Sequence, residues 1–255
     1  MSTPSNSSLW KNPLRLIPRT GSRGEWMFLG LLLSLAFMFL IYPWFHEFSY
    51  GPQLFLVIKI FIAIACGRLI LQERGQVMTF IILGIPMFAY GLCELVFPQT
   101  MQGPIVAVGH FFTLLFMLSM VQIILRLIYR EPAVSLDTLF GGVCGFVLLS
   151  IAFAHSYSVM EALVPGSFKL IDGPSDTHWD PKRDSFEGLL YSLLTLTTVS
   201  GDGIAPVTKT ARAMAAIEGV VGQFYMAIIV ADLVGKRLSA VMAPSDNDPT
   251  KTPAA

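Results

Sequence analysis

The chain has 255 residues, of which 54% are hydrophobic and only 13% are charged, and its net charge at pH 7 is zero. Its mean hydropathy of +0.64 is too high for an ordinary soluble domain. These values exclude a soluble globule and indicate an integral membrane protein surrounded by lipid. A zero net charge also gives no indication of a nucleic-acid partner.

Long apolar stretches follow one another along the chain. A helix needs about 20 mostly apolar residues to cross the hydrocarbon core of a bilayer. Six stretches approach or exceed this length, at residues 26–45, 53–71, 77–97, 105–125, 136–156 and 211–234. The expected fold class is therefore an all-α membrane protein with six transmembrane helices.

The basic residues indicate the orientation of these helices. They gather before the first stretch, around the turn after the second, after the fourth and after the sixth: Lys11, Arg15, Arg19, Arg23, Arg68, Arg74, Arg126, Arg130, Lys236 and Arg237. With six crossings all of them fall on one side, which the positive-inside rule makes cytoplasmic. We therefore expect a multi-pass protein of the cell membrane with both termini in the cytoplasm.

A different kind of segment separates the fifth and sixth stretches. A polar loop is expected from about Tyr157 to Asp184, and residues 185–198 are apolar but too short to cross. Asp184 and Glu187 have capping-box spacing, so FEGLLYSLLTLT predicts a helix of about three turns. The chain must then return without helical hydrogen bonds, which at membrane depth requires backbone buried in protein or lining a water-filled path. This pattern predicts a re-entrant helix followed by a pore-lining loop.

Three motifs in and after this segment carry a family resemblance. They are LLYSLLTLTTV at 189–199, IAPVTKTAR at 204–212 and EGVVGQFYMAIIVADLVG at 218–235. In order and spacing they resemble the pore-loop cation channels, in particular the small bacterial potassium-channel-like proteins with a pore helix, a filter and an inner helix. The resemblance covers residues 164–241 and implies a channel. An enzyme is not expected, since the chain has no nucleophile elbow, phosphate-binding loop or zinc signature.

The resemblance also assigns an ion-conducting filter, with the residues Thr197, Thr198, Val199, Ser200, Gly201, Asp202 and Gly203. In the family, filter carbonyls replace the hydration shell of potassium. The family's Gly-Tyr-Gly-Asp is Ser200-Gly201-Asp202-Gly203 here. Because serine reaches the required backbone conformations less easily than glycine, and glycine cannot brace the filter as tyrosine does, we expect an altered filter.

Three functions remain open at this point. The first is a potassium-channel-like cation channel that carries a monovalent cation, potassium by resemblance, and needs no cofactor or bound metal. The second is a non-selective sodium and potassium channel, indicated by Asp202 and by the lost tyrosine. An alternative alignment treats Ser200 as an insertion, and in either alignment four copies of Asp202 form an acidic ring at the outer mouth. The third is a non-conducting membrane scaffold or regulatory subunit with a decayed filter. Because one pore loop cannot enclose an axis, the resemblance implies a homotetramer.

Other residues in the apolar stretches suggest supporting roles. Gly219 and Gly222 lie one turn apart and predict either an inner-helix hinge or close helix packing. Glu218 stands where the family inner helix has a carboxylate behind the pore helix, which implies filter support, with a simple polar pocket as the alternative. Lys59 and Glu94 are expected to pair. The four histidines show no ligand spacing, so neither a metal site nor a pH sensor is expected from them.

These features divide the chain into four parts. Residues 1–25 form a cytoplasmic N-terminal segment, residues 26–130 a four-helix transmembrane region, and residues 241–255 a disordered C-terminal tail. Residues 131–240 form a pore domain, which contains an outer helix, an extracellular loop, the pore helix, the filter and the inner helix.

Overall fold

The structure is a computed structural model that describes residues 27–46, 60–65, 67, 77–97, 103–131, 134–171, 178–182, 185–199 and 203–242. Its helices are α1 (Met27–His46), α3 (Val77–Val96), α4 (Pro104–Arg130), α5 (Leu136–Leu163), α6 (Ser185–Leu196) and α7 (Lys209–Met242). Two short strands, β1 (Phe168–Leu170) and β2 (Ile204–Pro206), flank α6 in the sequence.

Five of the six expected apolar stretches coincide with the helices α1, α3, α4, α5 and α7. Among the described residues, four helices are long and apolar enough to cross a membrane, namely α3, α4, α5 and α7, and α1 adds a shorter apolar helix over Phe28–Leu40. Of the second stretch, the structure describes residues 60–65 and 67, which are helical. The rest of that stretch, including Lys59, lies outside the described residues.

The helix ends differ from expectation. α5 continues to Leu163, about two turns past the expected start of a polar loop at Tyr157, so that loop boundary is wrong. The reason is that the polar residues Tyr157, Ser158 and Glu161 are buried and not solvated. α7 likewise runs to Met242, so the first residues of the expected C-terminal tail are helical. The remainder of the tail and the N-terminal segment lie outside the described residues.

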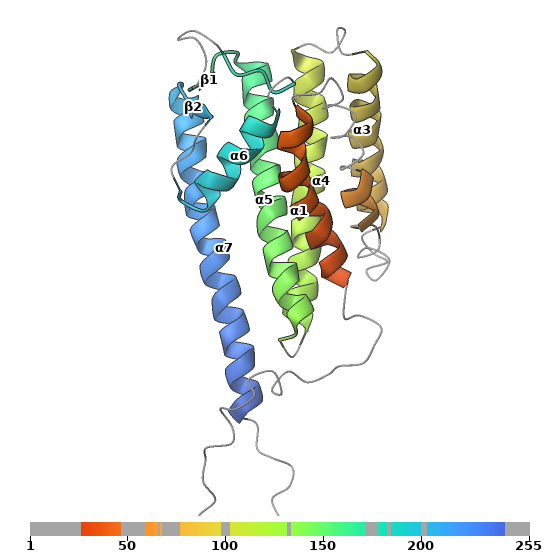
Figure 1. The fold of residues 1–255 in the computed structure, drawn as a ribbon, viewed down its shortest axis with the longest axis vertical. Coiled ribbons are helices and arrows are strands. Elements are labelled where there is room, and N and C mark those ends of the chain that lie inside the picture. Colours follow the sequence, from red (N-terminus) through yellow and green to blue (C-terminus); the bar gives the residue numbers. More distant parts are fainter. Residues whose placement is uncertain are drawn as a thin grey trace, which may run out of the picture.

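α5 is the central helix of the bundle. It packs against α4, α1, α6 and α7, while α3 packs on the far side of α4. In Figure 1, α3, α4 and α5 stand side by side, α7 lies at the opposite edge from α3, and the short α6 is inclined between α5 and α7. α5 therefore connects the first helices of the chain to the segment that carries the expected filter.

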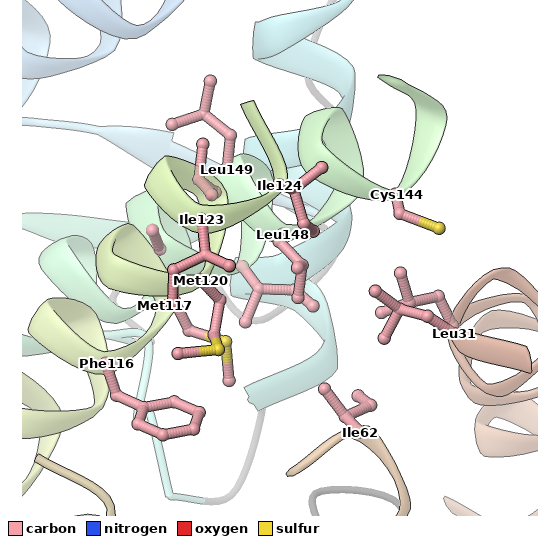
Figure 2. Packing of buried hydrophobic residues seen from close by; sticks show 14 of the residues in the cluster. Leu31, Ile62, Phe116, Met117, Met120, Ile123, Ile124, Cys144, Leu148 and Leu149 are labelled. Carbon is pink, nitrogen blue, oxygen red and sulfur yellow. The ribbon is translucent and has the colours of Figure 1, made fainter. Parts of the chain in front are cut away.

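The main apolar core lies between α1, α4 and α5. Figure 2 shows the side chains that meet there: Leu31, Ile62, Phe116, Met117, Met120, Ile123, Ile124, Cys144, Leu148 and Leu149. The start of α1 is fixed to α5 by the Phe28 amide, which donates to Asp137 Oδ1 at 2.9 Å, and by the Cys144 thiol, which donates to the Phe28 carbonyl at 3.6 Å. Close packing and these bonds hold α1 on the central helix.

The outer surfaces of the bundle are apolar as well. On α3, Met78, Ile82 and Ile85 are exposed, and on α7 the exposed apolar side chains include Val220 and Phe224. Such apolar outward faces suit lipid tails or neighbouring membrane helices and not water. The fold is that of a helical membrane protein.

Candidate functional site

The two strands fix one end of the candidate site. β1 follows α5, β2 precedes α7, and the two pair antiparallel with Leu170 opposite Ile204. The pairing is extended by the Ile171 amide, which donates to the Gly203 carbonyl at 2.9 Å. The end of α5, the start of α7 and the last expected filter residue therefore meet at one end of the molecule, which we call the strand end (Figure 1).

α6 runs from the strand end toward the middle of α7. Near the start of α6, the Glu187 carboxylate lies against Gly203. A Cβ atom added to Gly203 would be 2.1 Å from Glu187 Oε2. At the other end of α6, an added Cβ on Gly222 would lie 2.2 Å from the Leu196 carbonyl oxygen. Since a helix rises 1.5 Å per residue, Gly222 is roughly 20 Å along α7 from Lys209. The chain thus descends in α6 and returns to the strand end at Gly203.

Gly222 explains how closely α6 and α7 approach. Its Cβ position is occupied by backbone atoms of Leu196, whereas the Cβ position of Gly219 is 3.7 Å from the Thr195 carbonyl oxygen. The end of α6 can therefore lie against α7 only because residue 222 has no side chain. Close packing is the role that this contact supports for Gly222. α7 is one continuous helix through both glycines, and their hinge role stays a prediction.

Behind α6, Glu218 of α7 is fully buried with 0% exposure. The Tyr157 hydroxyl donates to its Oε2 atom, and its Oε1 atom is hydrogen-bonded to the Ser192 hydroxyl. Ser192 Oγ is also 2.7 Å from the Ser150 carbonyl oxygen of α5. These contacts join α5, α6 and α7 through one carboxyl group. Filter support by Glu218 stays a prediction. Its hydrogen-bond partners were missed because they lie far apart in the sequence.

An aromatic cluster forms a second wall behind α6. Tyr157, Phe168, Trp179 and Tyr191 pack edge to face, with ring centroids 5.0 to 6.3 Å apart. Trp179 is only 2% exposed, and Gly188 leaves room for its indole ring, because an added Cβ there would lie 2.4 Å from Cζ2. From the sequence, the segment around Trp179 was expected to be a polar loop. The tryptophan itself could have indicated that part of this loop packs against the helices, because so large an apolar side chain is usually buried.

A buried carboxylate shapes the turn after α5. Glu161 is buried, and its oxygens accept from the amides of Gly166 at 2.6 Å and Phe168 at 2.9 Å. These bonds satisfy backbone amides in the turn between the end of α5 and β1, and so they fix the direction in which the chain enters β1. Glu161 therefore fixes the frame on which α6 and the returning chain are held.

The expected filter begins at the end of α6. Thr197, Thr198 and Val199 are exposed on the single chain. The Thr197 hydroxyl can donate back to either of two helix carbonyls, those of Leu193 at 2.9 Å and Leu194 at 3.0 Å. Thr198 has φ 60°, a left-handed conformation that is rare for a β-branched residue. The chain therefore leaves α6 in a sharp and strained turn.

The outer part of the expected filter is described only at its last residue. Ser200, Gly201 and Asp202 lie outside the described residues. Gly203 is buried and has φ 83°, a conformation that glycine adopts without strain. The strain expected at Ser200 therefore stays a prediction, while a left-handed residue is found two positions earlier.

Two further sequence expectations concern the Lys59–Glu94 pair and the four histidines. Glu94 accepts a hydrogen bond from the Tyr90 hydroxyl at 3.4 Å, while its expected partner Lys59 lies outside the described residues. The structure brings His110 and His155 into contact, which spacing within one helix could not reveal. In the described part of the chain, no three histidine, cysteine, aspartate or glutamate side chains gather in a way that could hold a metal ion.

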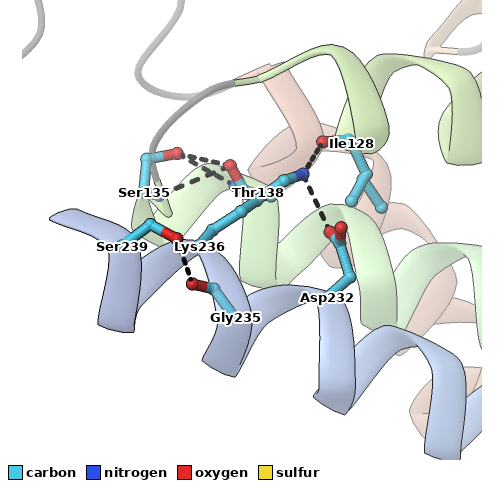
Figure 3. Close-up of polar contacts among 7 residues, drawn as sticks. All are labelled: Ile128, Ser135, Thr138, Asp232, Gly235, Lys236 and Ser239. Atoms are coloured by element: carbon cyan, nitrogen blue, oxygen red, sulfur yellow. Dashed lines mark hydrogen bonds and ion pairs between the residues drawn. The ribbon is translucent and has the colours of Figure 1, made fainter.

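The far end of α7 is joined to α4. The Lys236 ammonium group donates to the Ile128 carbonyl at 2.8 Å and lies 2.8 Å from Asp232 Oδ2 (Figure 3). The same ammonium group is 5.8 Å from the centre of the Tyr129 ring. A cation at the C-terminal end of α4 is favoured by the exposed carbonyls there. This contact connects the lower part of α7 to the helices that precede α5.

Comparison with known families places this site in context. Residues 142–237 match the family model described as an ion channel. A search of curated proteins and a search of solved structures found no match. The matched range contains α6, both strands, all seven expected filter residues, Gly219, Gly222 and Glu218. By this match, residues 142–237, which are less than half of the chain, are similar to a family of ion channels.

Proposed function

We propose that the protein is a cation channel of the cell membrane in which four copies surround one pore lined by Thr197 to Gly203. The observation that carries this proposal is the course of α6, which ends beside the middle of α7 before the chain returns to the strand end. A helix C-terminus at that depth presents partial negative charge, which stabilises a cation. Backbone that returns without helical bonds is suited to lining a water-filled path.

The exposed face of α7 supports a tetramer. Side chains along it are apolar and unburied, among them Ile217, Val220 and Phe224. A shallow groove farther along the helix is lined by Gln223, Met226, Ala227, Val230, Ala231 and Val234. In the proposed assembly this face lines the inner cavity and meets neighbouring copies, because a single pore loop cannot enclose an axis. We place six crossings in each copy, with residues 26–130 beside a pore domain of residues 131–240 and both termini cytoplasmic.

Potassium is the permeating ion that we propose, coordinated by carbonyl oxygens and without a cofactor. The aromatic cluster and the Glu218 contacts support this choice, because they hold α6 from behind where the family's filter tyrosine is absent. A non-selective channel is the second candidate, and the observation that favours it is the Asp202 carboxylate in place of a filter glycine.

Cation flux into liposomes tests the proposal. The purified protein is reconstituted, and potassium and sodium gradients are measured in parallel for the parent chain and for Thr198→Ala and Asp202→Asn. We expect flux in the parent and an altered rate or ion preference in both variants, since each changes the proposed path. Thr210→Ala, an exposed threonine at the start of α7, is the matched control and should conduct like the parent.

Each outcome of the flux experiment supports one interpretation. Flux of potassium alone supports the selective channel, and flux of both ions supports the non-selective one. Parent-like conduction by both filter variants would place the path elsewhere. A properly assembled protein with no flux under any gradient would favour a non-conducting scaffold or regulatory subunit.

A further inference from the structure

Two histidines from different helices touch inside the bundle. His110 of α4 and His155 of α5 have their Nδ1 atoms 2.8 Å apart and their ring centroids 5.1 Å apart. Both are buried, with 4% and 7% exposure. We propose that this pair is a proton-binding site that couples the pH outside the membrane to conduction. The second half of this inference rests on the proposed channel function.

Counting protons shows why the contact is sensitive to pH. In the neutral pair, one Nδ1 atom carries a hydrogen and donates to the other. One added proton can be placed on the far nitrogen of the donor ring, which keeps this hydrogen bond and makes it charge-assisted. A second proton places hydrogens on both Nδ1 atoms and brings two positive charges together. The observed contact is therefore compatible with at most one added proton.

The pair lies toward the strand end of the molecule. His110 is about 9 Å along α4 from Pro104, and His155 is about 12 Å from the last residue of α5, at 1.5 Å per residue. In the proposed orientation the strand end faces outward. The site is thus near the outer surface while still buried between helices, where a change in charge acts strongly on packing.

Titratable groups also lie on the elements that surround the pair. On α3, the Tyr90 ring lies 5.4 Å from the His110 ring, and its hydroxyl donates to Glu94. In the outer loop, Asp180 is an exposed acidic residue. On α5 itself, Glu161 lies about two turns beyond His155 toward the strand end. Across α5, Glu218 of α7 accepts from Tyr157.

α5 links the pair to the proposed pore. Tyr157 is two residues after His155 and donates to Glu218 behind α6. On the same helix, the Ser150 carbonyl lies 2.7 Å from Ser192 of α6. In this proposal, a second proton on the pair breaks its hydrogen bond to α4 and shifts the neighbouring part of α5, which carries both contacts. We therefore expect acid to lower conduction.

The first test is flux as a function of pH. Potassium flux is measured between pH 5 and 8 for the parent, His110→Asn, His155→Asn and His178→Asn. Asparagine can hydrogen-bond from a similar position but does not titrate, and His178 is an exposed outer-loop histidine that serves as the matched control. We expect parent flux to fall about tenfold or more at acid pH, since one pKa unit of difference between two states corresponds to tenfold. The fall should be absent in both pair variants and kept in His178→Asn.

The second test does not need conduction. The chain has four histidines, so ring nitrogens in protein labelled with ¹⁵N-histidine can be followed by NMR during a pH titration. We expect two rings to titrate in two separated, coupled steps, with each ring losing its coupling when the other is replaced by asparagine. Independent titration of all four rings would overturn the proton site. Parent-like acid inhibition in both pair variants, or flux independent of pH in the parent, would overturn its coupling to the pore. Coupled rings in a protein without flux would instead count against the channel function.

Discussion

Glu218 shows how much one proton matters at the scale of a residue. The Ser192 hydroxyl has one hydrogen but faces two acceptors, the Glu218 carboxyl group and the Ser150 carbonyl oxygen. Both contacts are hydrogen bonds at the same time only if Glu218 is protonated and donates to Ser192, which then donates to Ser150. Tyr157 still donates to the other oxygen of Glu218. A neutral carboxyl group also avoids burying an unpaired charge inside the membrane.

This proton count predicts a sharp difference between two variants. Glu218→Gln should keep assembly and flux, because the amide oxygen can accept from Tyr157 and the amide nitrogen can donate to Ser192. Glu218→Ala should lower the thermal unfolding temperature in detergent and reduce flux, since each buried polar group left unsatisfied costs about 1–3 kcal/mol. Equal damage in both variants would mean that Glu218 is ionised in the folded protein.

At the scale of the elements, sequence predicted where helices exist better than where they end. Apolar length marks a membrane helix regardless of its partners, so α3, α4, α5 and α7 were found. The end of α5 was missed because Tyr157 and Glu161 look like loop residues until their partners are known. Those partners lie on other elements, and a single sequence does not show which elements meet. The same reason explains why Glu218 was found by resemblance while Ser150, Ser192 and the histidine pair were not.

The contact between α6 and α7 gives a prediction at this scale. Gly222→Ala places a methyl group on backbone atoms of Leu196, which cannot move aside without shifting the end of α6. We expect a loss of stability on the order of 1–3 kcal/mol, measured by thermal unfolding in detergent, together with reduced flux. Gly235→Ala on the same helix is the matched control, because nothing lies within 4 Å of its Cβ position. It should be neutral or slightly stabilising, and equal stability of the two variants would show that α6 does not need this close approach.

At the scale of the whole molecule, two connections join the first helices to the proposed pore. One is α5, which packs against α1 and α4 as well as α6 and α7. The other is Lys236, which joins the lower part of α7 to the end of α4. A displacement of α4 can therefore reach α7 by two routes, through α5 and through Lys236. The first four apolar stretches thus have a physical route by which they can influence conduction.

Replacing Lys236 tests the lower connection. The contact with Ile128 and Asp232 holds α7 against α4, away from the proposed axis. Lys236→Met should let α7 move toward that axis and lower flux about fivefold, as expected for roughly 1 kcal/mol in a two-state equilibrium. The neighbouring exposed Arg237 provides the control, Arg237→Met, which should conduct like the parent. Unchanged flux in Lys236→Met would show that this contact does not bias the pore.

The attachment of α1 to α5 also bears on how the protein is made. Phe28 is bonded to Asp137 and Cys144, more than a hundred residues later in the chain. Membrane helices insert first and associate afterwards, so in the proposed six-helix arrangement α1 enters the bilayer well before its partner has been synthesised. It can take its final place only when α5 has been made. The order of synthesis and the order of assembly therefore differ, and α5 supplies the surface against which the earlier helix α1 finally packs.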